Sequence, residues 1–344
     1  MIAPWVGRAG ALLVAEAGVN HDGFVERAHR LVDAAADAGV DAVKFQTFRA
    51  DEVISPSARK APYQLASGPG TQLEMVRALE LPPEAFLALR DHAVSRGLLF
   101  LSTPFDEASV DLLVLLGVPA LKIASGEIDN VPLLRRVAAT GLPVMISTGM
   151  ATQAEVDAAV AELARAAALA ILQCTSAYPA PLEESSLRAM LAMSERAGAT
   201  PGFSDHTRGH VAAVAAAVLG ARVLEKHLTL DPGAIGPDHS MSASPPELAQ
   251  WVEAIRGAES ALGDGTKRVS TAEARNLPVV RRAIVARRKI RTGEPLTEVN
   301  ITTRRPAQGI PAARWDLVVG RTAHRDYVAD EPIEFPPETA HDII

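Results

Sequence analysis

The stretch 202–239 places two histidines where they could share a metal ion. His206 ends one short apolar run, GFSDH, and His227 ends the next, RVLEKH, with the helix-like run VAAVAAAVLG between them. A strand, helix, strand unit makes the two strands parallel, so their carboxyl ends meet at one edge of a sheet. Neutral imidazole is the commonest protein metal ligand. Three acids lie beside these strand ends: Asp205, Glu225 and Asp238. We therefore predict a metal site at His206 and His227; the alternative is one buried and one surface histidine with no shared role.

Polar side chains also stand near the ends of the other β-type runs. Alternate residues of a strand face the same way, and one of the two faces fills the interior of a barrel. The polar residues near these strand ends are Glu16, Lys44, Gln46, Thr103, Lys122, Ser125, Glu127, Ser147, Ser176, Tyr178, Ser204 and Glu225. Burying so many polar groups without partners would cost several kcal/mol. Any one of them could be a hydrogen-bonded core residue, but the set indicates a polar pocket.

The predicted pocket divides into two chemical halves. One half is cationic and rich in hydroxyl donors: Lys44, Lys122, Thr103, Ser125, Ser147 and Ser176. This half suits the oxygens of phosphate and carboxylate groups. The other half is acidic and contains the histidines: Glu16, Glu127, Glu225, Asp238, His206 and His227. It suits a divalent cation and a neutral polyhydroxylated partner. A small dianion beside a metal-bound carbonyl points to carbon–carbon bond formation.

The elements that must position these residues alternate regularly. Apolar β-type runs alternate with helical runs about eight times, from ALLVAEAGV to RVLEKHLTL, and the helical runs end at glycines such as Gly117 and Gly198. Strands that are apolar almost throughout are buried on both faces, as in a parallel sheet. Eight such units predict an α/β fold of the (β/α)8 TIM-barrel type. A doubly wound open sheet also alternates, but its glycine-rich nucleotide loop is missing here.

The chain is longer than one barrel requires. We expect the barrel in residues 1–265, a polar, turn-rich linker in 266–282, and a small second domain in 283–344 that would bury little core by itself. The connection 49–83 is unusually long and should lie at the catalytic face of the barrel as a lid or substrate loop.

Bulk composition narrows the function classes. The 344 residues are 48% hydrophobic and carry a formal net charge of −7, so they provide a large core and no basic surface for nucleic acid. The single cysteine, Cys174, fits a reducing cytoplasm. The N-terminus lacks the apolar core of a signal peptide, and no apolar run reaches membrane-spanning length.

A series of motifs carries a resemblance to a known family. In order, the chain contains AEAGVNHDG, AVKFQTF, LFLSTPF, LKIASGE, ISTGM, CTSAYPAP, GFSDHT, LEKH and GPDHSMS. This series resembles the sialic acid synthase family. In the long loop, KAPYQ and QLEMVRALEL resemble its N-acetylneuraminate and legionaminate synthase branches. After the barrel, RRPAQGI resembles the antifreeze-like (SAF) domain that ends these enzymes, a small β-clip-like fold.

The resemblance implies an enzyme that condenses phosphoenolpyruvate with an open-chain N-acyl-mannosamine-type sugar, giving a nine-carbon sialic (nonulosonic) acid and phosphate. It implies Mn2+ or Mg2+ as cofactor, with His206 and His227 as ligands. Phosphoenolpyruvate contacts are implied at Lys44, Thr103, Lys122, Ser125, Ser147 and Ser176. Sugar contacts are implied at Glu127, Tyr178 and Asp238, and Gln46 is expected to bind substrate as well. The expected catalytic residues are Glu16, Glu127, Lys44 and Lys122.

Assembly follows from the same resemblance. Family members are homodimers in which the small domain closes the partner's barrel. We therefore expect a domain-swapped homodimer in which Arg305 approaches the sugar's N-acyl group beside Glu16 of the other chain. Arg305 taken alone reads equally well as a solvated surface residue.

Departures from the family pattern leave the sugar open. Ala177 stands where many relatives have Asn, and Ala243 and Ser244 stand where many have Leu and Glu. A legionaminate- or pseudaminate-type synthase using a 2,4-diacetamido-6-deoxyhexose is the alternative. Two further rivals are a Schiff-base aldolase, which would need a neutral lysine in the barrel, and a carbohydrate- or ice-binding protein built around the terminal domain.

Overall fold

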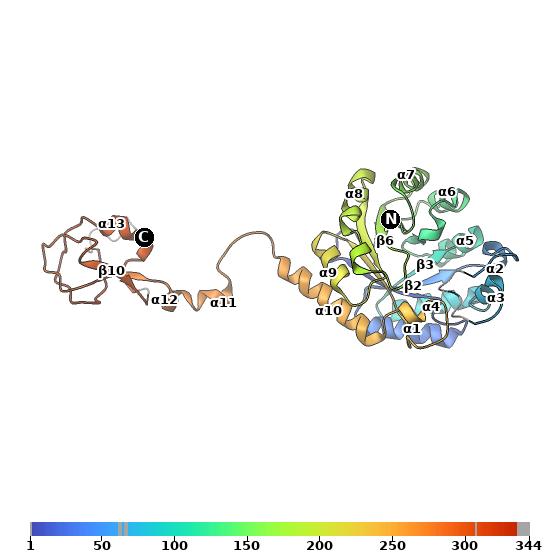
Figure 1. Ribbon diagram of the computed structural model, residues 1–344, viewed down its shortest axis with the longest axis horizontal. Helices are drawn as coiled ribbons and strands as arrows, with labels where there is room; N and C mark the ends of the chain where they lie inside the picture. The colour runs from blue at the N-terminus through green and yellow to red at the C-terminus, as the bar shows by residue number, and fades with distance from the viewer. Residues whose placement is uncertain (1, 61–63, 65–67, 307, 336–344) are drawn as a thin grey trace. The chain divides into compact units, whose positions relative to one another are not determined.

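The computed structural model describes residues 2–60, 64, 68–306 and 308–335 (Figure 1). Parts of two motifs, residues 61–63 of KAPYQ and residue 307 of RRPAQGI, lie outside the described residues. The chain forms two compact units that divide between Gly263 and Asp264, and each is described separately here.

The first unit is a closed barrel of eight parallel strands, in which β8 pairs with β1. The strands are β1 (Leu12–Gly18), β2 (Ala42–Thr47), β3 (Leu99–Pro104), β4 (Leu121–Ile123), β5 (Val144–Ser147), β6 (Leu169–Cys174), β7 (Thr200–Asp205) and β8 (Val223–His227). The predicted (β/α)8 barrel is confirmed. The runs read as strands are buried almost throughout because helices cover their outer faces.

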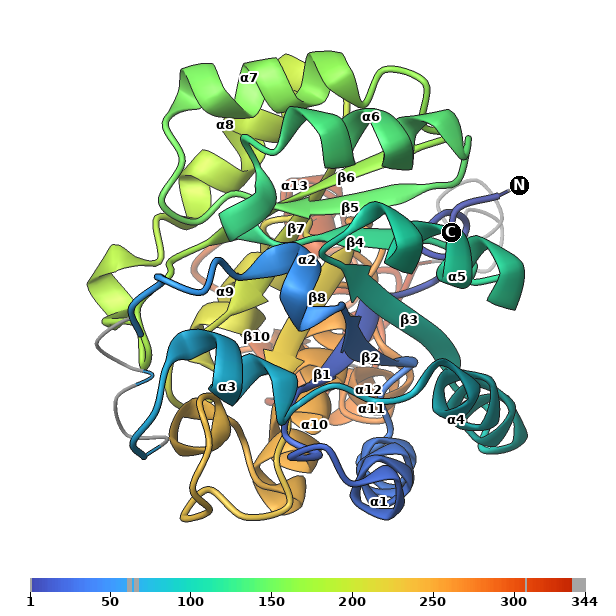
Figure 2. The ribbon, with the colours of Figure 1, turned by 90° about the vertical axis from the view of Figure 1, so that its right-hand side faces the viewer.

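The covering helices are α1 (Val25–Asp37), α4 (Pro83–Ser95), α5 (Glu107–Leu116), α6 (Val131–Ala139), α7 (Gln153–Glu162), α8 (Leu187–Ala197), α9 (Val211–Val218) and α10 (Pro245–Leu262). Figure 2 shows them around the rim of the barrel. Helices α5 and α8 end at Gly117 (φ 72°) and Gly198 (φ 61°), the left-handed caps that the glycines predicted.

The barrel interior is layered by polarity. Its lower part is filled by apolar side chains that include Leu12, Val14, Leu101, Met145 and Leu172. The charged and hydroxyl side chains stand above this plug, near the carboxyl ends of the strands. This apolar layer stabilises the barrel through the hydrophobic effect, which a cluster of buried charges cannot do.

The long connection 49–83 contains two short helices, α2 (Ala50–Val53) and α3 (Gln72–Arg77). Both lie on the side of the barrel toward which the strands point (Figures 1 and 2). Side chains from both helices line the same cavity as the strand ends. The connection therefore forms one wall of the pocket.

The second unit has its own core. It contains α11 (Thr271–Ala274), α12 (Leu277–Val280), the antiparallel pair β9 (Ala283–Ala286) and β10 (Ile301–Arg304), and α13 (Trp315–Val318). Ile284, Ile290, Ile301 and Tyr327 are buried together in it. The segment 266–282, which we expected to be a linker, thus includes the two short helices α11 and α12. In the described part of the chain, no helix combines the length and apolarity needed to cross a membrane.

Candidate active site

A cavity of about 440 Å³ opens at the carboxyl ends of the barrel strands. The strand register sets its floor, because Glu16 of β1 lies level with Lys44 of β2 on one side and with His227 of β8 on the other. The cavity brings together the predicted residues Glu16, Lys44, Gln46, Thr103, Lys122, Ser125, Glu127, Ser147, Ser176, Tyr178, His206, His227 and Asp238. Arg305 belongs to the other unit, where it directly follows β10 and is exposed.

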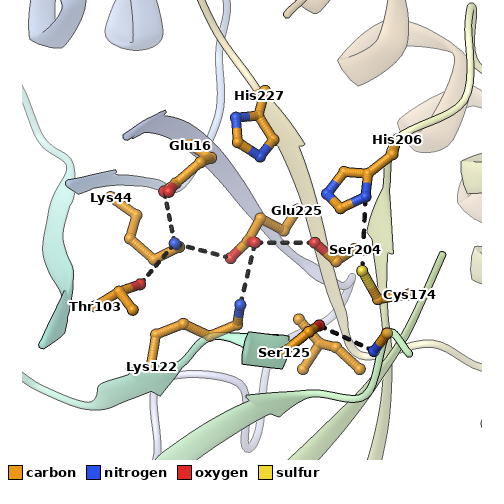
Figure 3. Close-up of polar contacts among 12 residues, drawn as sticks. Glu16, Lys44, Thr103, Lys122, Ser125, Cys174, Ser204, His206, Glu225 and His227 are labelled. Carbon is orange, nitrogen blue, oxygen red and sulfur yellow. Dashed lines mark hydrogen bonds and ion pairs between the residues drawn. The ribbon is translucent and has the colours of Figure 1, made fainter. Parts of the chain in front are cut away.

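Buried ion pairs join the two lysines to acids at the floor of the cavity (Figure 3). Lys44 Nζ lies 2.6 Å from Glu16 Oε2 and 3.6 Å from Glu225 Oε2, and it donates to Thr103 Oγ1 at 2.9 Å. Lys122 Nζ lies 3.3 Å from Glu225 Oε1. The expectation of separate cationic and acidic halves is therefore wrong. Unpaired lysines could not be buried this deeply, so acids neutralise them.

The two acids of this network differ in protonation. Burial raises the pKa of Glu16 to about 7, although Lys44 opposes the shift. Burial also acts on Glu225, but Lys122 and Lys44 outweigh it and lower its pKa to about 2. Glu225 therefore stays a carboxylate, whereas Glu16 can give or take a proton near neutral pH. Burial alone would lower the pKa of Lys44, but Glu16 and Glu225 raise it, which disfavours a neutral Schiff-base nucleophile at that position. At Lys122, by contrast, burial lowers the pKa despite Glu225.

Hydroxyl groups converge on Gly149, just after β5. The backbone N–H of Gly149 donates to Ser125 Oγ at 2.9 Å. A Cβ at Gly149 would come 2.2 Å from Ser176 Oγ and 3.0 Å from Ser125 Oγ, so only glycine leaves room for them. The buried Ser147 Oγ has no partner among the described residues. Such a cluster of donors suits an oxygen-rich anion.

The two predicted metal ligands face the same cavity. Their ring centroids are 5.4 Å apart. His206 donates from Nδ1 to the carbonyl of Thr175 at 2.8 Å, which directs its Nε2 lone pair elsewhere. Burial lowers the pKa of His227 well below its ordinary value and keeps that ring neutral. His227 Nδ1 is buried without a hydrogen-bond partner in the described structure, 3.8 Å from Asp238 Oδ2.

The histidine pair fits an open metal site rather than a closed one. Across the described residues, no group of three or more His, Cys, Asp or Glu side chains is arranged to hold a metal ion. Two imidazoles would leave the remaining coordination positions to substrate or water, and a catalytic metal site needs at least one such open position. Asp205, one of the acids beside the predicted ligands, accepts from Lys226 Nζ and Trp251 Nε1, both at 3.0 Å, outside the barrel interior.

Hydrogen bonds from neighbouring loops fix the position of Asp238 beside His227. Ser242 Oγ donates to the carbonyl of Asp238 at 2.6 Å, and Asn20 Nδ2 donates to Ser242 Oγ at 2.9 Å. His239 Nε2 lies 3.0 Å from Asp22 Oδ1. The NHD segment after β1 thus positions the loop after β8. Burial raises the pKa of Asp238 to about 6.

Two features of the site were not predicted from the sequence: the pairing of Glu225 and the place of Cys174. Glu225 was recognised as an inward-facing acid, but its pairing with both lysines was not. Cys174 was read only for its redox compartment, yet its Sγ lies 3.6 Å from His206 Nδ1. Strand parity could have found it, because the inward-facing Leu172 lies two residues earlier on β6.

Comparison with known proteins identifies the family. Residues 31–267 match the NeuB family, and residues 281–336 match the SAF domain. The chain belongs to the NeuB family. It is 45% identical to N,N'-diacetyllegionaminic acid synthase of Campylobacter jejuni, over 94% of this chain and 98% of that protein. It is 42% identical to the enzyme of the same name from Legionella pneumophila, over 90% of this chain and 89% of that protein.

A solved structure of the same family shares the fold. N-acetylneuraminic acid (sialic acid) synthetase from Leptospira borgpetersenii, in complex with citrate, superposes with a TM-score of 0.69 at 32% identity, covering 78% of this chain and 90% of that one. These NeuB-family relatives are named synthases, and the protein is an enzyme of this type. The resemblance stated from the sequence motifs is confirmed at the level of the family, the barrel and the SAF domain.

Proposed function

We propose that the protein condenses phosphoenolpyruvate with the open-chain form of an N-acyl amino sugar, giving a nine-carbon 2-keto sugar acid and phosphate. The observation that carries this proposal is the composition of one cavity: two buried lysines and a cluster of hydroxyls for an anion, beside two imidazoles for a carbonyl-binding cation. An apolar or purely sugar-binding site would not need the buried ion pairs.

The chain's own residues account for the charge and proton movements. Carbon 3 of phosphoenolpyruvate attacks the aldehyde carbon, and the aldehyde oxygen takes a proton from protonated Glu16 to become a hydroxyl. Water adds to carbon 2, and the tetrahedral product expels phosphate by breaking the carbon–oxygen bond. Glu16, with a pKa of about 7, takes the proton of the water, and Lys44 and Lys122 stabilise the charge on the phosphate and carboxylate. An 18O label in the bridging oxygen should therefore leave with the phosphate.

A divalent cation, Mn2+ or Mg2+, would be held by His206 and His227 and would supply Lewis acidity at the aldehyde oxygen. The neutral His227 ring and the carbonyl-bound Nδ1 of His206 support this assignment.

Within this class we propose a 2,4-diacetamido-2,4,6-trideoxyhexose as the sugar and N,N'-diacetyllegionaminic acid as the product. The identities of 45% and 42% to two enzymes of that name support this choice over N-acetylmannosamine, since the sialic acid synthetase is 32% identical. We further propose that the enzyme works in the cytoplasm as a homodimer, with Arg305 contributed by the partner.

Phosphate release with a panel of amino sugars tests the proposal. Purified enzyme, phosphoenolpyruvate and Mn2+ should release phosphate with the diacetamido-trideoxyhexose and form a nine-carbon acid visible by mass spectrometry. Borohydride added with substrate should not attach any fragment to Lys44 or Lys122. A trapped lysine adduct would instead establish the Schiff-base aldolase, and the absence of turnover with every N-acyl hexosamine would refute the proposed reaction.

A further inference from the structure

Helix α3 turns its apolar face toward the cavity instead of the hydrophobic core. Gln72, Met75 and Val76 line the cavity, and their spacing of three and four residues places them on one face of the helix. Leu79, just after the helix, lines the cavity too. No residue of α3 itself is buried in the described structure. An amphipathic helix usually buries its apolar face in the protein core. The apolar face of α3 lines the cavity instead, so it is placed to contact a molecule bound there.

Neighbouring elements extend this face into a wall. Val53 of helix α2 and the next residue, Ile54, line the cavity, as do Phe48 and Phe105, which directly follow β2 and β3. The two phenyl rings meet edge to face with centroids 6.2 Å apart. We define the apolar wall as Phe48, Val53, Ile54, Met75, Val76, Leu79 and Phe105. It belongs to the same cavity as the charged floor.

Polar contacts join the elements that carry the apolar wall. Arg77 of α3 pairs with Asp51 of α2. The backbone N–H of Arg49 donates to Asp106 Oδ2 at 2.9 Å, and Asp106 also caps α5 by accepting from Ser109 N at 2.8 Å. These contacts join α2 to α3 and join α2 to the barrel. They leave the apolar side chains directed at the cavity.

An apolar wall favours one kind of sugar. Phosphoenolpyruvate is a small, highly charged molecule that gains nothing from it, and a fully hydroxylated sugar would lose water from its hydroxyl groups there. We propose that the apolar wall binds the methyl groups that distinguish the substrate: the terminal methyl of a 6-deoxy sugar and the methyl of its second acetamido group. This inference rests on the proposed condensation reaction and names the residues that would select its sugar.

One polar pair on the wall fits the same substrate. Gln72 Nε2 donates to Gln64 Oε1 at 3.2 Å, and both side-chain amides line the cavity beside the apolar wall. Amides pair well with the amide of an acetamido group. The second acetamido group would thus place its methyl on the apolar side chains and its amide near Gln72.

The expected selectivity is moderate. Apolar pockets discriminate by roughly 10- to 200-fold for one methylene, and by roughly 100-fold against an added hydroxyl. The wild-type enzyme should therefore show a kcat/KM about 100-fold higher for 2,4-diacetamido-2,4,6-trideoxymannose than for N-acetylmannosamine. Both kcat/KM values are measured at saturating phosphoenolpyruvate and Mn2+, so that their ratio depends only on the sugar.

Two near-isosteric substitutions test the wall. Val76→Thr and Val53→Thr each replace a methyl group of the wall by a hydroxyl, and each should reduce the ratio to roughly tenfold, mainly by lowering kcat/KM for the deoxy sugar. The KM for phosphoenolpyruvate should not change. Val94→Thr is the matched control, because Val94 lies on α4, is 62% exposed and does not line the cavity. It should leave the ratio unchanged.

The outcomes separate this inference from the proposed reaction. A wild-type enzyme that uses both sugars equally well would overturn the inference while leaving the reaction intact. So would an unchanged ratio in both folded threonine variants. Equal losses with both sugars, accompanied by dissociation of an assembled enzyme in size-exclusion chromatography, would make the wall a protein–protein contact instead. No phosphate release with either sugar would refute the reaction itself.

Discussion

Replacing Gly149 by alanine should separate anion binding from folding. Gly149 does not have a positive φ, so alanine is compatible with its backbone. The new Cβ would lie 2.2 Å from Ser176 Oγ, whereas ordinary contact begins at 3.4 Å, so that hydroxyl must move by about 1.2 Å. Overpacking of this kind costs about 1–3 kcal/mol, which a domain stable by about 5–15 kcal/mol survives.

The functional cost should be larger than the stability cost suggests. A displacement of about 1 Å in a positioning group can reduce catalysis roughly 100-fold, equivalent to about 2.7 kcal/mol of transition-state stabilisation. Steady-state phosphate release should therefore show this loss in kcat/KM for phosphoenolpyruvate, with little change in the KM of the sugar. Gly257→Ala is the control, because a Cβ at Gly257 in α10 meets nothing within 4 Å.

A double-mutant cycle decides whether the clash is the cause. Ser176→Ala removes the hydroxyl that the new methyl group would strike. If the mechanism is steric, Gly149→Ala should cost much less in the Ser176→Ala background than in the wild type. Additive losses, or a loss confined to the sugar KM, would refute the assignment of these groups to the anion site.

Three further predictions concern the charges, the cation and assembly. Lys44→Met should raise the KM of phosphoenolpyruvate about 10- to 100-fold, since a hydrogen bond to a charged group contributes about 1.5–3 kcal/mol; a change in the sugar KM alone would contradict this. EDTA should abolish turnover and Mn2+ should restore it, and His206→Ala and His227→Ala should each lose bound Mn2+ by elemental analysis while retaining their circular dichroism. Full activity of verified metal-free enzyme would exclude this role. Glu16→Gln and Arg305→Ala should each be nearly inactive alone but recover activity as a mixed dimer with about one working site in two; no recovery in a confirmed mixed dimer would place Arg305 in its own chain's site.

The sequence predicts which faces of the barrel strands are polar, because side-chain direction follows a period of two. Glu16, Lys44 and Glu225 all point inward as parity requires. Parity cannot predict how these side chains pair, because pairing depends on the stagger between strands that are distant in sequence. Glu16 and His227 are level only because β8 closes the barrel against β1 in that register. For this reason parity does not predict that Glu225 of β8 pairs with Lys44 and Lys122.

The wall of the cavity was predictable only in part. The length of the connection 49–83 indicated a segment over the catalytic face, and α2 and α3 do contribute to the cavity. The spacing of Gln72, Met75 and Val76, three and four residues apart on α3, would ordinarily indicate a helix face packed on the core. Only the three-dimensional arrangement shows that this face is directed at the cavity. The difference matters for function, since the same pattern then indicates a ligand contact instead of a contribution to stability.

The charge network at the floor limits how the site can bind an anion. Lys44 is held by Glu16 and Glu225 in the free enzyme, and Glu225, with a pKa of about 2, keeps its negative charge at any working pH. A bound phosphate or carboxylate would therefore have to compete with Glu16 for Lys44. Of the two acids, Glu16 is the one that can release Lys44, because burial already raises its pKa to about 7 and protonation removes its charge. In the proposed reaction, the residue that releases the lysine would thus also be the one that exchanges a proton with the reacting molecules, and anion binding and proton transfer would be coupled through Glu16.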